Sequence, residues 1–123
     1  MEEMSLLLPT GELRPDLEVT QIGGRRRFRT APRSQLGERT LSVIGGRLRP
    51  EDSVALAFGR LPTAQDCVRY ASVVVLREAG FVVEWNPTRR NRLHCSIESP
   101  TGWDEDVRER FNACFGEIVE MER

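Results

Sequence analysis

The stretch TAQDCVRYASVVVLREAGFVVEW, residues 63–85, decides the predicted fold because it holds two periodic patterns in succession. In its first part, apolar residues recur at helical spacing: Ala64, Cys67, Val68, Ala71, Val74 and Val75. Thr63 and Asp66 resemble a capping box at the start of this helix, and Gly80 is a natural end. Phe81, Val83 and Trp85 then share one face of a predicted strand.

Two further elements are expected toward the C-terminus. Leu93, Cys95 and Ile97 alternate and predict a second strand, which the turn-rich basic loop 86–92 joins to the first. The last apolar stripe predicts a helix and consists of Trp103, Val107, Phe111, Cys114, Phe115 and Ile118. Asp104, Glu105 and Asp106 lie in its first turn, where the helix dipole favours acids.

Glycine pairs organise the N-terminal half. Gly23-Gly24 separates two alternating runs, 17–22 and 25–30, which is a hairpin signal. A second pair, Gly45-Gly46, follows the predicted strand 40–44 and precedes 47–49, and an apolar strand is expected at 53–58. The tetrapeptide Ile-Gly-Gly-Arg therefore occurs at 22–25 and 44–47, which is a sign of a repeated hairpin that chance explains equally well.

These patterns predict an α+β fold with the order β-β-β-β-α-β-β-α. We expect a two-layer sandwich, with a mainly antiparallel sheet of about five to six strands and two helices on one face. The part from residue 53 on resembles most of a ferredoxin-like unit. Residues 1–16 are expected to form an N-terminal tail, and residues 17–123 a single domain.

Composition excludes several kinds of site. All 18 basic residues are arginine, so neither a lysine Schiff base nor a Walker A loop can form. With one histidine and three scattered cysteines, no metal site, cofactor site or disulfide framework is predicted. The chain shows neither a signal peptide nor a membrane span, so we expect a cytoplasmic protein. Arginine in place of lysine suggests a GC-rich bacterial genome.

Charge is unevenly distributed along the chain. Residues 14–49 carry nine arginines against three acids, whereas residues 50–123 carry nine arginines against thirteen acids. The arginines gather around Phe28 and in the loop 86–92, where their guanidinium groups suit carboxylates or phosphates. Such a surface binds an acidic protein partner or nucleic acid, or it simply keeps the sheet solvated.

The single histidine gives the one catalytic hypothesis. If Trp85 pairs with Leu93, Glu84 lies opposite His94 on the outward face, whereas a register shifted by two places Glu84 beside Ser96. No nucleophile accompanies His94 in the first arrangement, and the favoured interpretation is a solvated polar pair. We therefore expect no enzyme. Cys67, Cys95 and Cys114 are each expected to face the core.

The favoured function is a small interaction or regulatory protein that binds another protein or a second copy of itself. The alternative is a nucleic-acid-binding accessory domain that uses the hairpin 25–29 and the loop 86–92. On the predicted helix, Val73 and Leu76 project away from the apolar stripe and could contact a partner. The predicted contact residues are Arg25, Arg27, Arg29, Arg47, Arg49, Val73, Leu76, Arg89, Arg90 and Arg92.

Overall fold

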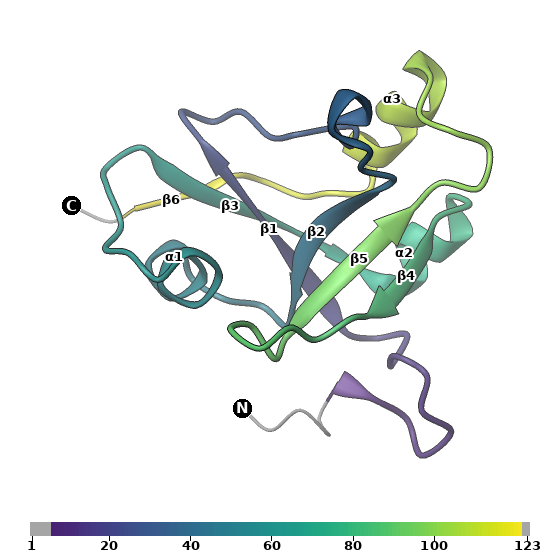
Figure 1. Ribbon diagram of the computed structural model, residues 1–123, viewed down its shortest axis with the longest axis horizontal. Coiled ribbons are helices and arrows are strands. Elements are labelled where there is room, and N and C mark those ends of the chain that lie inside the picture. Colours follow the sequence, from purple (N-terminus) through teal and green to yellow (C-terminus); the bar gives the residue numbers. More distant parts are fainter. Residues whose placement is uncertain (1–5, 122–123) are drawn as a thin grey trace.

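Six strands form one antiparallel sheet in the computed structural model, which describes residues 6–121 (Figure 1). They lie in the order β4-β5-β2-β1-β3-β6. Their bounds are β1 Glu18–Gly24, β2 Thr40–Gly45, β3 Asp66–Ser72, β4 Val82–Trp85, β5 His94–Glu98 and β6 Val119–Glu120. The helices are α1 Pro50–Phe58, α2 Val73–Glu78 and α3 Glu105–Ala113, with a 3-10 turn at Ser34–Leu36. The predicted α+β class and antiparallel sheet are confirmed.

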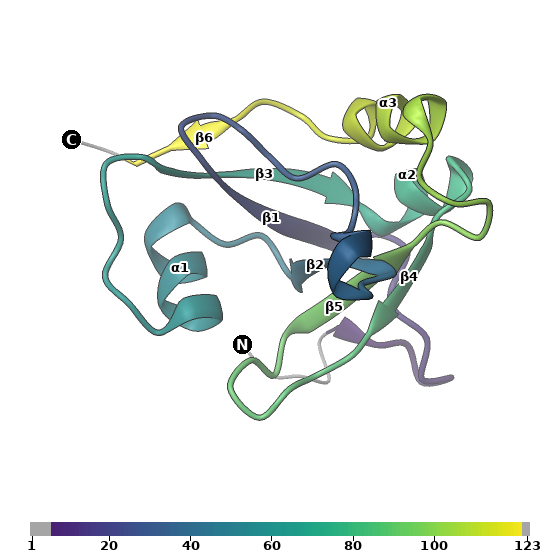
Figure 2. The same ribbon diagram turned by 45° about the horizontal axis from the view of Figure 1, so that its top comes forward.

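The two faces of the sheet differ in their cover. The closed face lies under α2 and α3, whereas α1 lies on the other side, near β1 and β3 (Figure 2). We call that other side the open face, because side chains alternate along β2 between buried Leu41 and Val43 and the more exposed Thr40 and Ser42. Half of the sheet therefore keeps one face in contact with solvent.

Two segments have the opposite secondary structure from the one predicted. The segment expected as a strand at 53–58 is helix α1, which has Pro50 at its start and Gly59, with φ 62°, as its C-cap. The segment expected as a helix from Thr63 is instead strand β3 up to Ser72, and α2 begins only at Val73. Residues 66–71 are all buried, so both faces of β3 are covered, and the helical spacing of its apolar residues arises by coincidence.

The late start of α2 also corrects the predicted contact residues. Val73 and Leu76 are 0% exposed and belong to the core, so the prediction that they project outward is wrong. Val74 and Val75, at 39% and 41%, are the residues exposed in their place. The predicted apolar stripe begins at Ala64 and runs through β3. A strand has a different period from a helix, so continuing this stripe into α2 assigns the wrong residues to its buried face.

Residues 6–16, assigned to a tail, pack against the domain. Leu6 and Leu13 are buried in the core cluster. The main-chain N–H groups of Val73 and Val74 donate to the carbonyl oxygens of Leu17 and Pro15. The segment therefore covers α2, which the sequence had left with spare apolar surface.

The two Ile-Gly-Gly-Arg segments have different structures, so the hairpin is not repeated. After Gly24 the chain turns back at once through Arg25 and Arg26, whose φ values are 53° and 62°, and Gly24 and Arg27 exchange two main-chain hydrogen bonds. This is the geometry of a type I′ turn, and no strand follows at 25–30. After Gly46 the chain leaves the sheet toward α1.

From β3 onward the elements follow one another as β-α-β-β-α-β, which completes the succession expected of a ferredoxin-like unit. The sheet order departs from that fold, because β1 and β2 lie between β3 and β5. Within residues 6–121 no helix is long and apolar enough to cross a membrane.

One arginine lies inside the closed face. Arg69 on β3 is 8% exposed, and its guanidinium carbon lies 4.5 Å from the ring centre of Phe28 and 4.3 Å from that of Phe115. Its Nε donates to Oε1 of Gln21, and its NH2 nitrogen has no hydrogen-bond partner. Burial lowers the pKa of Arg69 to about 10, so the group remains charged at neutral pH.

Candidate binding site on the open face

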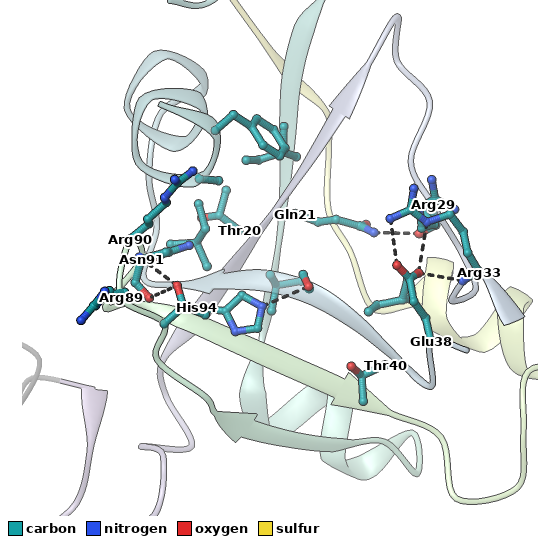
Figure 3. Close-up of a pocket in the computed structure, with 18 residues that line it drawn as sticks. Thr20, Gln21, Arg29, Arg33, Glu38, Thr40, Arg89, Arg90, Asn91 and His94 are labelled. Carbon is teal, nitrogen blue, oxygen red and sulfur yellow. Dashed lines mark hydrogen bonds and ion pairs between the residues drawn. The ribbon is translucent and has the colours of Figure 1, made fainter. Parts of the chain in front are cut away.

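A basin of about 870 Å³ lies on the open face where β1 and β2 diverge (Figure 3). These strands pair at only two positions, Val19 with Gly45 and Thr20 with Ile44, and then separate. The end of α1 and the loop 86–92 form one side of the basin, and residues from the segment 29–38 form the other. The divergence of two strands thus creates the hollow, and the connecting segments wall it.

Arginines surround this basin. Arg29 and Arg33 lie on one side and Arg89 and Arg90 on the other, while Glu38 is the single acid among the lining residues that the structure describes (Figure 3). Arg33 and Glu38 form a two-pronged ion pair, with a shortest N–O distance of 2.8 Å. This pairing lowers the pKa of Glu38 and raises that of Arg33. The basin therefore carries net positive charge and suits an anionic group.

Hydrogen bonds hold the loop 86–92 in shape. Asn91 is buried, and its Oδ1 accepts from the main-chain N–H of Leu93 at 3.0 Å. The hydroxyl of Thr88 accepts from the N–H of Asn91, and the carbonyl of Asn91 accepts from the N–H of Thr88. The indole N–H of Trp85 donates to the carbonyl of Arg92. Arg89 and Arg90 are thus presented by an ordered turn.

His94 and Ser42 lie together in the floor. The Nε2 of His94 is 3.0 Å from the Oγ of Ser42, and its Nδ1 is 2.7 Å from the carbonyl oxygen of Asn86. The structure has the shifted register, since Trp85 pairs with Cys95 and Glu84 with Ser96. The expectation that Glu84 lies opposite His94 is therefore wrong, and a serine from β2 contacts the ring instead.

The structure brings three of the predicted contact residues together and separates the others. Arg29, Arg89 and Arg90 line the basin, so the hairpin end and the loop meet there. Arg25 lies in the turn, and Arg27 closes it through main-chain hydrogen bonds. Three more arginines lie outside the basin lining: Arg47, Arg49 and Arg92. Arg47 pairs with Glu18 and stacks on Tyr70, and Arg49 pairs with Glu51.

Sequence reasoning missed Arg33, Thr40 and Ser42 as lining residues. Arg33 lies in a segment without periodicity, and the two hydroxyl residues are simply the outward positions of an alternating strand. A signal for Ser42 did exist, because a polar residue inside an apolar strand marks the solvated face. Its contact with His94 depends on the pairing of β2 with β5, which places Ile44 opposite His94.

A buried glutamine connects the basin to the closed face. The Nε2 of Gln21 donates to the carbonyl of Arg29 at 2.7 Å, while its Oε1 accepts from Arg69. The main chain that presents Arg29 is thus fixed through Gln21 to the buried arginine.

Two of the three cysteines lie where the sequence placed them. Cys67 and Cys95 are buried, and burial raises the pKa of Cys95 to about 12. Cys114 is only partly buried, so its predicted inward position is only partly realised. Within residues 6–121 no three His, Cys, Asp or Glu side chains gather in a way that could hold a metal ion.

Comparison with family models, curated proteins and solved structures finds no match to this chain. The chemistry of the basin therefore carries the functional argument. Its elements are four arginines against one glutamate, a floor of hydroxyl and apolar side chains, and a histidine in contact with a serine.

Proposed function

We propose that this protein acts by binding an acidic segment of another protein in the open-face basin. The observation that carries the proposal is the convergence of Arg29 and Arg33 with Arg89 and Arg90 around one hollow. Guanidinium groups bind carboxylates through paired N–H donors, and several of them around a concave surface select a segment with several acids.

The apolar part of the lining favours a protein segment. Ile22, Ile44 and Ala57 line the basin beside the arginines, and Phe58, which is 59% exposed, lies at the end of α1. Protein interfaces typically combine such an apolar centre with a charged rim. A partner segment that alternates acidic and apolar side chains matches this surface.

Nucleic acid is the second candidate, because the two segments predicted to bind it do meet in the basin. Single-strand binders usually present several aromatic rings for base stacking. Phe58 is the only aromatic residue in the basin lining, and Phe28 packs on Arg69 instead. The scarcity of aromatic side chains in the basin therefore favours a protein partner over nucleic acid.

The experiment measures fluorescence anisotropy of three labelled probes at several salt concentrations. The probes are a short peptide rich in glutamate and leucine, the same peptide with lysine for glutamate, and a single-stranded DNA of equal charge. Of the three probes, we expect only the acidic peptide to bind. Its affinity should fall about tenfold or more when Arg89→Glu and Arg29→Glu are combined.

The matched control is Arg108→Glu combined with Arg110→Glu, which changes net charge equally on α3, away from the basin. It should leave peptide binding unchanged. Tight DNA binding with a log affinity–log salt slope of about −3, as expected for four phosphate contacts, would replace the protein partner by nucleic acid. Equal binding of the acidic and basic peptides would refute both candidates.

A further inference from the structure

Ser42 and His94 have the arrangement of a nucleophile and its base. The Asn86 carbonyl can only accept a hydrogen bond, so the ring nitrogen facing it at 2.7 Å must carry a proton. In the neutral imidazole this leaves Nε2 without a proton. Nε2 therefore accepts from the hydroxyl of Ser42, whose oxygen is 3.0 Å away.

The surrounding structure fixes both partners. Ser42 and His94 lie on paired strands, β2 and β5, so their separation is set by main-chain hydrogen bonds rather than by a flexible loop. The main-chain N–H of Asn86 donates to the carbonyl of His94 at 2.9 Å, which holds the Asn86 carbonyl beside the ring. A nucleophile, a base and a group that orients the base are thus present on one rigid frame.

Access and charge complete the site. Ser42 is exposed at the floor of the basin, so a substrate can reach its oxygen. The same basin carries Arg29, Arg89 and Arg90, whose positive charge favours an anionic substrate.

We propose that Ser42 is the nucleophile and His94 the general base of an esterase activity toward small esters that carry a carboxylate. This activity goes beyond the proposed binding of a protein segment and does not depend on it. The sequence predicts no enzyme, because it indicates no nucleophile beside His94. The pairing of β2 with β5 brings Ser42 to that position.

The reaction balances with water as the second reactant. The Ser42 oxygen attacks the ester carbonyl carbon while the serine proton moves to Nε2 of His94. The tetrahedral intermediate expels the alcohol, which takes that proton, and the acyl group remains on Ser42. Water, deprotonated by His94, then attacks the acyl-serine and releases the carboxylic acid, and the proton returns to Ser42.

The first test is covalent labelling with a fluorophosphonate, which reacts with activated serines. The labelled residue is located by peptide mass mapping in the folded full chain. We expect an adduct on Ser42 that is absent in Ser42→Ala and forms about a hundredfold more slowly in His94→Ala, since a general base contributes about that much.

The matched control is Ser96→Ala. Ser96 lies opposite Ser42 in the β2–β5 register, but the His94 ring contacts Ser42. Labelling of Ser42 should continue unchanged in this variant. An adduct that forms equally fast in His94→Ala, or no adduct on Ser42 beyond that on urea-unfolded protein, would overturn the proposal. Both serines are outward-facing, so their alanine variants are expected to fold, and circular dichroism verifies it.

The second test compares hydrolysis of the p-nitrophenyl monoester of succinic acid, which carries a carboxylate, with that of neutral p-nitrophenyl acetate. We expect a preference of about tenfold for the anionic ester that disappears when Arg89→Ala and Arg90→Ala are combined. Hydrolysis that survives Ser42→Ala would assign the activity to another group and refute this proposal. A Ser42→Ala variant that loses the esterase activity but still binds the acidic peptide would support this proposal and show that it is independent of the proposed function.

Discussion

The two faces of the sheet use arginine for opposite purposes. On the closed face, Arg69 is 8% exposed, lies between aromatic rings and has no carboxylate partner within residues 6–121. On the open face, Arg29, Arg89 and Arg90 surround a hollow in which Glu38 is the one acid among the described lining residues. The same residue type is thus packed inside the fold on one side and, in the function proposed above, serves recognition on the other.

Because of this difference, we expect stability and the proposed binding to be separable in this molecule. Replacing a closed-face residue should change the free energy of unfolding, because it removes contacts that the core needs. Replacing an open-face arginine should change affinity alone, because exposed charges contribute little to folding.

Leu76→Asp should unfold the protein, whereas Val75→Asp should not. Leu76 is 0% exposed and Val75 is 41% exposed, although they are neighbours on α2. A buried unpaired carboxylate together with the lost packing costs about 5 kcal/mol or more, which is most of a domain's stability. Urea denaturation followed by circular dichroism measures both variants. A cooperative Leu76→Asp transition near that of the wild type would show that α2 is turned the other way.

Arg69→Ala should destabilise the protein by about 3 kcal/mol, because it leaves a cavity and an unpaired Gln21. Arg69→Met fills most of the volume without a buried charge. The folded pKa of Arg69 is about 10, below its ordinary value, so the penalty for its charge is present below that pH and is relieved only above it. Met is therefore expected within about 1 kcal/mol of the wild type at neutral pH. If Met were as harmful as Ala, the hydrogen bond to Gln21 would outweigh the packing.

Phe28→Ala should lower the free energy of unfolding by about 2 kcal/mol, since its ring covers one side of the Arg69 guanidinium. Phe58→Ala, the matched change on the open face, should stay within about 0.5 kcal/mol. Thermal unfolding of the two variants measures the contrast. Equal losses would mean that Phe58 packs into the fold despite its 59% exposure.

Arg89→Ala combined with Arg90→Ala should leave the free energy of unfolding within about 0.5 kcal/mol of the wild type. Both side chains are exposed on a loop held by Thr88 and Asn91, which the change does not touch. Affinity for the acidic peptide should fall about tenfold in the same protein. A stability loss comparable to that of Phe28→Ala would show that these two arginines stabilise the fold, as Arg69 and its covering rings do.

Sequence reasoning identified elements best where one face is buried and the other solvated. β4 and α3 lie within the predicted segments and β5 overlaps its own, because their apolar residues follow a single period. It failed at β3, where burial of both faces removes the alternation. It failed at α1 because the apolar content of 53–58 outweighed Pro50, Glu51 and Asp52, which are start signals of a helix.

The candidate site was only partly predictable for a different reason. The sequence singled out Arg29, Arg89, Arg90 and His94 by composition, and all four line the basin. It could not predict which arginines meet, since that depends on the divergence of β1 from β2. Nor could it predict the partner of His94, because a shift of two residues between β4 and β5 satisfies the same alternation.

The enclosure of Arg69 has a consequence for how the chain reaches its native state. One covering ring, Phe28, follows the first strand, and the other, Phe115, comes from the last tenth of the chain. The closed face therefore cannot be completed before Phe115 has been synthesised and has reached Arg69. The central strand pairs, β1 with β3 and β2 with β5, also join distant parts of the sequence. Such non-local pairing makes folding slow, so we expect the native state to form over about milliseconds to seconds.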